Sequence, residues 1–530
     1  MKTLKSLLLA GALALPLAAS PLAGALADTP DGLLIVAQNI DDIVAIDPAQ
    51  AYEFTSGELV TNVYDRLVQY DAEDTTTLAP GLATEWSIDE TAKTITFTMR
   101  EGATFHSGNP VTAEDAAGSL QRVIKLNLTP AFILAQLGWT AENVDEMVTA
   151  DGNTVTIRYE GDFSPAFVMN VLASRPASIV DMQTVMENET DGDMGNAYLN
   201  ANSAGSGPFE LQAYRPAEII RLKANESYFK EGPKIDGVIL QHVAESATQQ
   251  LLLEQGDVDI ARNLTPDQVA SLDDGIKVET FPQAAVHFLS FNQKTDSLTD
   301  PAVWEAARYL VNYQGMADTI LAGQMEIHQA FWPNGFPGAL TDTPFTYDPE
   351  RARTILEEAG VELPIQVEMD VINAAPFTDM AQSLQASFAD AGIEFEILPG
   401  TGAQVITKYR DRTHEAMLLY WGPDFMDPHS NAKAFAYNSD NSDDNYTATT
   451  TWRNSWAVPD ELNAMTTAAL TEADPEARLS MYEELQRRVQ ETSPIVIMFQ
   501  ASYQVAMDEA VTGYVNGATS DFVFYRLVKK

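Results

Sequence analysis

Cysteine is absent from the 530-residue sequence, and this absence limits the kinds of protein it can be. Without cysteine there is no disulfide framework, no thiol nucleophile, no cysteine-ligated zinc and no lipid attached through an N-terminal cysteine. Basic residues are also few, since 31 lysines and arginines stand against 76 aspartates and glutamates, for a net charge of −45. Such a charge repels nucleic acid and anionic membrane surfaces. Adaptation of an exported protein to salty surroundings explains this negative charge better than a role in binding a particular ligand. We expect no nucleic-acid partner.

Apolar runs long enough to cross a membrane are missing after the N-terminal segment. Residues 1–27 carry lysines, then an apolar stretch, then the small residues 25–27, which is the pattern of a secretory signal peptide with its cleavage site. Pro16 and Pro21 interrupt the apolar stretch and argue against a membrane anchor. We therefore predict a soluble protein in the periplasm of a bacterium with two membranes, exported by its signal peptide and not a lipoprotein.

The sequence also lacks the common signatures of catalytic, nucleotide and metal sites. It has no Gly-x-Ser-x-Gly, and the Gly-Ser-Gly-Pro at 205–208 lacks the Lys-Ser/Thr of a phosphate loop. We expect 205–208 to be a tight turn with a close backbone approach. The six histidines stand singly, without a His-x-x-x-His pair, and His106 at a strand end is expected to bond backbone groups. No metal, no cofactor and no catalytic residue is predicted.

Two patterns of secondary structure follow one another along the chain. Residues 93–105 and 153–161 alternate polar and apolar side chains after turn signals, and predict antiparallel hairpins. Between them, 112–126 has helical spacing with Thr112 as N-cap and predicts a helix packed on this sheet. The segment 348–360 predicts a helix with Asp348 as cap and Gly360 as stop, and from there onward helix, stop and strand recur. This recurrence implies βαβ units around a mixed or parallel sheet. The predicted fold class is α/β.

One short segment, residues 420–431, sets two carboxylates among aromatic residues, glycine and proline. Its Asp427 stands directly before a proline, where an aspartate is a good N-cap for the helical segment that follows. Asp424 has no such role, because it follows a strand end between Trp421 and Phe425, where open α/β sheets place ligands. A carboxylate among aromatic rings is costly to bury unless a cation meets it. We predict that Asp424 meets a ligand cation such as an ammonium group.

A longer segment, 78–120, contains a series of motifs in a fixed order. These are Pro-Gly-Leu-Ala, a tryptophan, an Asp-containing turn, an alternating strand, Arg-x-Gly, Phe-His-x-Gly, a proline and Thr-Ala-x-Asp. The series closely resembles the signature of the family 5 solute-binding proteins of ABC importers, which bind dipeptides, oligopeptides and nickel. The resemblance continues through segments such as 46–71, 225–238 and 291–316, and it covers nearly the whole chain after the signal peptide.

The resemblance implies a fold of the periplasmic binding protein type II-like kind, with mixed sheets, two ligand-enclosing lobes and an extra inserted domain. Closure of the two lobes about a hinge would enclose the ligand. The expected division of the chain is a signal peptide, 1–27; a discontinuous domain I, 28–68, 203–285 and 500–530; a domain II that carries the signature, 69–202; and a domain III, 286–499.

The resemblance also implies where a ligand binds. In peptide-binding members, a run of the form Trp-x-x-Asp-aromatic-x-acid-Pro supplies an aspartate for the ligand's α-ammonium, and Asp424 matches that position. Pro423 and Phe425 stand where peptide binders often have alanine and tyrosine. Arg453, between tryptophans, is the candidate partner of a ligand carboxylate, or else a surface arginine stacked on an aromatic ring. The predicted ligand-binding residues are Tyr52, Phe54, Trp421, Gly422, Asp424, Phe425, Trp452 and Arg453.

Three functions follow from these observations. The favoured one is a monomeric, non-enzymatic binding protein that captures a short peptide or a related amine-bearing solute and delivers it to an ABC permease in the inner membrane. The same role for nickel, haem, an oligosaccharide or an opine-like compound is the alternative. The least favoured is a periplasmic hydrolase that uses Asp424 and Asp427, which would require both acids to face one cleft.

Overall fold

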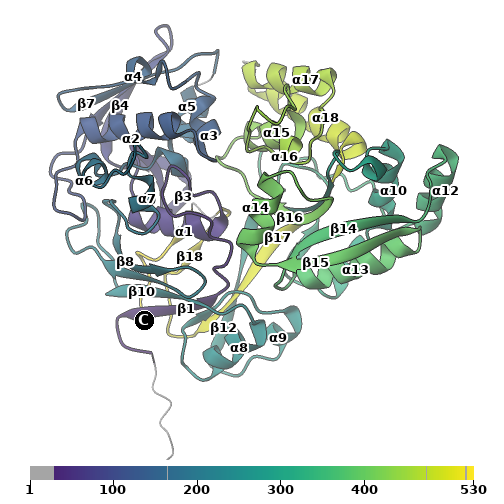
Figure 1. Cartoon of the computed structure of the whole chain (residues 1–530). Helices are drawn as coiled ribbons and strands as arrows, with labels where there is room; N and C mark the ends of the chain where they lie inside the picture. Colours follow the sequence, from purple (N-terminus) through teal and green to yellow (C-terminus); the bar gives the residue numbers. More distant parts are fainter. Residues whose placement is uncertain (1–28, 164, 473, 520–521) are drawn as a thin grey trace, which may run out of the picture.

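The computed structural model describes residues 29–163, 165–472, 474–519 and 522–530 (Figure 1). The predicted signal peptide lies outside the described residues. The described chain folds around three large hydrophobic cores, which we number I to III. None of the helices in these residues is both long enough and apolar enough to cross a membrane.

Core I is assembled from stretches that lie far apart in the sequence. Its buried residues come from 34–64, 180–260 and 505–528, and it is covered on one side by helix α1. Strand β1 pairs in parallel with β10 and β11, so the N-terminal strand lies inside the sheet. The elements around this core are β1 (Leu33–Gln38), α1 (Phe54–Val63), α6 (Met182–Glu187), α7 (Asn196–Leu199), β8 (Phe209–Arg215), β9 (Ile219–Ala224), β10 (Gly237–His242), β11 (Ile260–Ala261), β18 (Val515–Asn516) and β19 (Val523–Phe524). Helices α8 (Ser246–Glu254) and α9 (Pro266–Ala270) pack around a smaller cluster on Ala37 and Ala261.

Core II contains the segment whose motifs resemble the family signature. A four-stranded antiparallel sheet, in the order β4-β5-β7-β6, buries alternate side chains against helix α2. Thr112 and Asp115 form the expected capping box at the start of α2. The elements are β2 (Val68–Asp71), β3 (Asp74–Pro80), β4 (Ala83–Asp89), β5 (Thr94–Met99), α2 (Ala113–Leu126), α3 (Ala131–Ala135), α4 (Val144–Met147), β6 (Val148–Asp151), β7 (Thr154–Arg158), α5 (Pro165–Leu172) and the 3₁₀ helix η1 (Arg175–Ala177).

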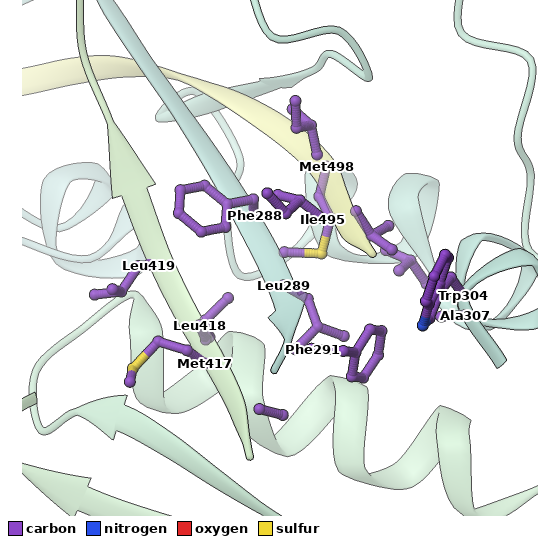
Figure 2. Close-up of a cluster of buried hydrophobic side chains, with 14 of the residues drawn as sticks. Phe288, Leu289, Phe291, Trp304, Ala307, Met417, Leu418, Leu419, Ile495 and Met498 are labelled. Carbon is purple, nitrogen blue, oxygen red and sulfur yellow. The ribbon is translucent and has the colours of Figure 1, made fainter. Parts of the chain in front are cut away.

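Core III is the largest core, and Figure 2 shows part of it: side chains of the neighbouring strands β16, β12 and β17 meet there, among them Leu418, Phe288 and Met498. Asp348 caps helix α12 and Gly360 ends it in the left-handed conformation, as the sequence predicts. The elements are β12 (Ile276–Phe291), η2 (Asp296–Leu298), α10 (Pro301–Leu310), α11 (Tyr313–Asp318), β13 (Met325–Ile327), α12 (Pro349–Ala359), β14 (Ile365–Ile372), α13 (Phe377–Ala389), β15 (Ile393–Gly400), α14 (Gly402–Arg410), β16 (Ala416–Trp421), α15 (His429–Ala436), α16 (Thr450–Arg453), α17 (Asp460–Thr471), α18 (Pro475–Thr492) and β17 (Ile495–Asp508).

The long strands β12 and β17 join core III to core I. They pair antiparallel over nearly their whole length, and β17 contributes Phe499 to core III but Met507 to core I. The sheet that they share has eleven strands, ten of them in the order β15-β14-β16-β12-β17-β11-β1-β10-β9-β8, with β13 beside β17. Because β14 is parallel to β15 and β16 while β12 is antiparallel to β16, the sheet is mixed and the predicted α/β class is confirmed.

The close backbone approach predicted at 205–208 is present, but the segment has a bend at 207–208 in place of the predicted tight turn. A Cβ atom on Gly205 would stand only 2.0 Å from the carbonyl oxygen of Val63, so a side chain has no room there. His106 Nε2 lies 3.0 Å from the carbonyl oxygen of Gly207, and this agrees with the expected bond to the backbone. The exact boundaries predicted for the three domains stay a prediction.

Candidate functional site

A partly open cavity of about 60 Å³ collects six of the eight residues predicted to bind ligand. They come from three stretches of sequence, namely the approach to α1, the end of β16 and the short helix α16. Figure 1 shows α14 and β16 on the side of core III nearest to α1, where these stretches meet. The six residues are Tyr52, Phe54, Trp421, Gly422, Asp424 and Arg453.

Gly422 allows one wall of this cavity to close. A Cβ atom at Gly422 would stand 2.8 Å from the ring of Phe54, which is closer than a side chain tolerates. Phe54 in turn meets Tyr420 edge to face, with 4.7 Å between the ring centroids. The glycine is therefore required because an aromatic ring packs directly against the backbone where β16 ends.

Asp424 lies in this cavity with 3% of its surface exposed. Its backbone N–H donates to the hydroxyl oxygen of Ser430 at 2.7 Å, which holds the turn after β16. The hydroxyl of Tyr52 hydrogen-bonds to the Asp424 carboxylate. Burial, followed by the negative charge of Asp424, raises the pKa of Tyr52 well above its ordinary value, so the phenol stays protonated and acts as the donor.

Arg453 brings a positive charge to the same cavity. The side chain is 3% exposed, and its guanidinium lies 5.5 to 5.8 Å from the ring centroids of Tyr52, Tyr409 and Trp421. Its Nε and Nη2 atoms have no hydrogen-bond partner among the described residues. Burial, and after it the charge of Arg410, lowers the pKa of Arg453 below its ordinary value. The alternative of a surface arginine is wrong, because the stacked guanidinium is buried.

Two further arginines line the cavity and were not predicted. Arg410, in the last turn of α14, forms an ion pair with Glu53. Arg175, in η1, donates from Nη1 to the backbone oxygen of Glu53 at 3.0 Å. Neither arginine belongs to a local motif, and each reaches the cavity only because α14 and η1 pack beside the approach to α1. The cavity thus joins side chains from around all three cores and holds charges of both signs.

Two of the predicted residues lie elsewhere. Phe425 packs perpendicular to Phe167 in core II, with 5.5 Å between the ring centroids. Trp452 donates from Nε1 to the backbone oxygen of Ser442 at 2.9 Å and carries the guanidinium of Arg412 over its ring. Successive residues of a helix point about 100° apart, so Trp452 cannot share the direction of its neighbour in α16. The structure does not bring Phe425 and Trp452 to the cavity.

Asp427 has a structural partner that the sequence did not indicate. Its carboxylate accepts two bonds from Arg478 of α18, with Nη2 at 2.7 Å and Nη1 at 3.0 Å. It also accepts from the N–H of His429, the first residue of α15, at 2.9 Å, although the N-cap position itself is Pro428. The predicted capping contact exists, but the ion pair with Arg478 is the larger interaction. Asp427 is not among the residues that line the cavity of Asp424.

The fold and this charged cavity are those of a ligand-binding protein. A family model described as bacterial extracellular solute-binding proteins, family 5 Middle, matches residues 77–443, which is more than half of the chain. The chain belongs to this family, and it is a solute-binding protein rather than an enzyme.

Individual relatives cover almost the entire chain. The sequence is 27% identical over 505 residues to the probable D,D-dipeptide-binding periplasmic protein DdpA of Escherichia coli (strain K12), with 94% of each chain covered. Its fold is similar to that of the periplasmic binding protein DppA from Helicobacter pylori, solved in complex with the peptide STSA, at a TM-score of 0.82 and 22% identity over 94% of this chain and 98% of that one. The binding protein MoaA from A. tumefacien R10, in complex with mannopinic acid, gives a TM-score of 0.82 and 20% identity over 94% and 99%.

Proposed function

We propose that this protein is the periplasmic solute-binding component of an ABC importer, and that its solute is a short peptide or a related compound with an amine and a carboxylate. The observation that carries the proposal is that Asp424 and Arg453, of opposite charge and each 3% exposed, line one cavity. A solute that bears both an ammonium and a carboxylate group is complementary to such a pair, because the ammonium is attracted to the Asp424 carboxylate and the carboxylate to the Arg453 guanidinium.

The ammonium group is placed at Asp424. The Tyr52 hydroxyl holds the carboxylate in position, and the ring of Trp421 presents an aromatic surface on which a cation is also favoured. Exchange of the tyrosine's hydrogen bond for one from an ammonium keeps the carboxylate satisfied while it gains a full positive charge. Affinity at this end therefore depends on charge as well as on shape.

The carboxylate group is placed at Arg453. The planar guanidinium offers Nε and Nη2 as donors, the edge that binds both oxygens of a carboxylate in parallel bonds. The rings of Tyr52, Tyr409 and Trp421 hold this edge in place before a ligand arrives. A preformed donor pair lowers the entropy lost on binding.

The proposal includes the location of the protein in the periplasm and the delivery of its solute to a permease. The signal-peptide pattern at 1–27 and the absence of cysteine support export to the periplasm without a lipid anchor. Relatives named as dipeptide-binding proteins of Escherichia coli and Pseudomonas aeruginosa support a peptide as the solute. Closure of the parts around cores I and III on the ligand would create the surface that an inner-membrane permease recognises.

Thermal unfolding of the purified protein tests this proposal. The panel contains dipeptides, N-acetylated dipeptides, dipeptide amides, mannitol and nickel ions. A bound ligand at about 100 times its Kd adds roughly 2.7 kcal/mol to the free energy of unfolding, which raises Tm measurably. We expect free dipeptides to raise Tm and both blocked forms to fail. Stabilisation by nickel or mannitol, with none by an amine-bearing compound, would contradict the proposal.

A further inference from the structure

A second cavity, of about 170 Å³, shares a wall with the first, and none of the predicted residues except Phe54 belongs to it. We call it the second chamber. The rings of Phe54 and Tyr420 line both cavities and meet edge to face, so they form the partition between them. The second chamber lies along the strands β12 and β17, from which His287 and Gln504 face it.

Buried polar atoms without partners collect in this chamber. His287 is 1% exposed, and neither of its ring nitrogens has a hydrogen-bond partner among the described residues. Asn516, 3% exposed, leaves Nδ2 unpartnered, and Gln504 leaves Oε1 unpartnered. Gln38 Nε2 and Asp42 Oδ1, which also belong to lining residues, have no hydrogen-bond partner among the described residues either. A buried polar atom to which nothing bonds destabilises the folded protein. Five side chains from different parts of the chain that are unsatisfied at one place indicate a site for a ligand.

The charge of the chamber excludes an anion as its occupant. Among the described residues that line it, the one lysine or arginine is Arg262, whose Nη1 is 2.7 Å from a carboxylate oxygen of Glu58 and 3.0 Å from the amide oxygen of Gln38. The chamber also contains Asp41 and Asp42. A carboxylate or phosphate would find no spare counter-charge there. This chamber therefore differs in kind from the cavity of Arg453.

The unpartnered atoms offer donors and acceptors in balance. Burial lowers the pKa of His287 to about 3, so the imidazole is neutral, with one nitrogen as a donor and the other as an acceptor. Asn516 and Gln38 each add an amide N–H donor, and Gln504 and Asp42 each add an oxygen acceptor. A hydroxyl group both donates and accepts, and it turns to suit each neighbour. The His287 ring also packs with those of Phe377 and Tyr420, at 5.5 and 5.8 Å between centroids, in a cluster of three rings that provides apolar surface beside the polar atoms.

We propose that the second chamber binds an uncharged polyhydroxylated group, held by His287, Asn516 and Gln504. The group is either a free polyol or a polyol arm on a solute whose charged end occupies the first cavity. The inference does not depend on an ammonium or a carboxylate at Asp424 and Arg453, because it concerns other side chains and an uncharged ligand.

Titration calorimetry with three probes tests the proposal. The probes are mannitol, glutamate with a mannityl chain on its nitrogen, and N-methylglutamate, which has the same charged end without the polyol. The variants are His287→Phe, which keeps an aromatic ring in the cluster with Phe377 and Tyr420, and Asn516→Leu, which keeps the volume. His328→Phe is the control, because His328 is equally buried but bonded to the backbone oxygen of Trp332.

We expect the mannityl compound to bind at least ten times more tightly than N-methylglutamate, and both chamber variants to abolish that difference while His328→Phe keeps it. Mannitol that binds alone, with the same sensitivity to the chamber variants, identifies a free polyol as the occupant. Asp424→Asn should weaken binding of the charged probes alone. The proposal for the first cavity and the proposal for the second chamber therefore fail with different experimental results. If no probe distinguishes the chamber variants from the native protein, the chamber holds only water and the proposal is wrong.

The stability of the ligand-free protein supplies a second measurement. Replacement of an unsatisfied buried imidazole by an apolar ring of similar shape is neutral or stabilising, whereas loss of a satisfied one is destabilising. We expect Tm of His287→Phe to equal or exceed that of the native protein, and Tm of His328→Phe to fall. A lower Tm for His287→Phe would show that its nitrogens have structural partners, which would overturn the binding role.

Discussion

Glu53 and Arg410 form an ion pair that ties the approach to α1 to the last turn of α14. The other end of α14 is tied as well, because the N–H of Gly402 donates to the carboxylate of Asp41 at 3.2 Å and the N–H of Ala403 donates to the backbone oxygen of Asp41 at 2.9 Å. Core I and core III are therefore held together at both ends of one helix, on either side of the cavity.

The first prediction concerns this pair. Glu53→Gln and Arg410→Met should each weaken dipeptide binding at least tenfold, because each leaves a buried charge without its partner. The double variant should lose less binding free energy than the sum of the losses of the two single variants, with a coupling energy of about 1 to 3 kcal/mol. A double-mutant cycle by calorimetry measures this coupling. Additive losses would mean that the pair does not hold the cavity closed.

The second prediction separates stability from binding at Arg453. Arg453→Met should raise the free energy of unfolding of the ligand-free protein by about 1 kcal/mol, because it removes a desolvated charge with unpartnered donors. It should also abolish dipeptide binding. The matched control is Arg412→Met, since Arg412 is equally buried but bonded to Ser455, Asn441 and Asp443. That control should be destabilised. Urea unfolding of both variants measures the difference, and a destabilised Arg453→Met would contradict it.

The third prediction concerns pH and Asp42, a residue of the second chamber. Burial raises the pKa of Asp42 from 3.8 to about 7, so the folded protein keeps a proton that the unfolded chain releases above about pH 4. The stabilisation from this proton is complete below pH 4 and is lost as pH rises toward 7. Asp42→Asn removes the effect. Urea unfolding from pH 4 to 8 should show the native protein losing stability relative to Asp42→Asn as pH rises.

A control for this pH dependence is Asp444→Asn, which makes the same chemical change at an exposed position. The difference between Asp444→Asn and the native protein should stay constant over the same pH range. A constant difference for Asp42→Asn as well would show that Asp42 is ionised in the folded protein at every pH tested.

The fourth prediction assigns Asp427 to structure alone. Asp427→Asn removes the charge that pairs with both Nη atoms of Arg478, and should lower the free energy of unfolding by about 1 to 3 kcal/mol. Dipeptide affinity should change less than threefold, because Asp427 does not line the cavity. Unfolding and calorimetry on the same preparation check both values. A loss of affinity similar to that of Asp424→Asn would restore the idea of two acids acting together.

Local features were predictable because the residues that determine them are close in sequence. The capping box of Thr112 and Asp115, the Asp348 cap and the left-handed Gly360 each involve side chains and backbone within one or two helical turns. Asp424 was identified for a similar reason, since a strand end, a glycine and flanking aromatic residues occur within a few positions. The alternation of helix and strand then indicated the mixed sheet.

Features that join distant segments were not predictable from pattern alone. Arg175 and Arg410 stand 235 positions apart (410 − 175), yet both contact Glu53, and no local motif marks either one. The second chamber depends on the same kind of long-range packing, because His287 looks like any strand residue until its unpartnered nitrogens are seen. Trp452 and Phe425 show the converse, because their proximity in sequence to Arg453 and Asp424 suggested a shared site. The helix rotation at Trp452 and the turn at Phe425 direct their side chains away from the cavity.

The most direct test of the proposed binding mode removes one charge from the ligand and its partner from the protein together. Calorimetry would compare alanyl-alanine, its N-acetyl form and its amide on the native protein, Asp424→Asn and Arg453→Met. Loss of a buried charge pair costs roughly 2 to 5 kcal/mol. We predict that acetylation of the dipeptide weakens its binding to the native protein by that amount but barely changes its binding to Asp424→Asn. Amidation of the dipeptide should likewise weaken its binding to the native protein but barely change its binding to Arg453→Met. If acetylation lowers the affinity of the native protein and of Asp424→Asn equally, the ligand ammonium does not bind at Asp424.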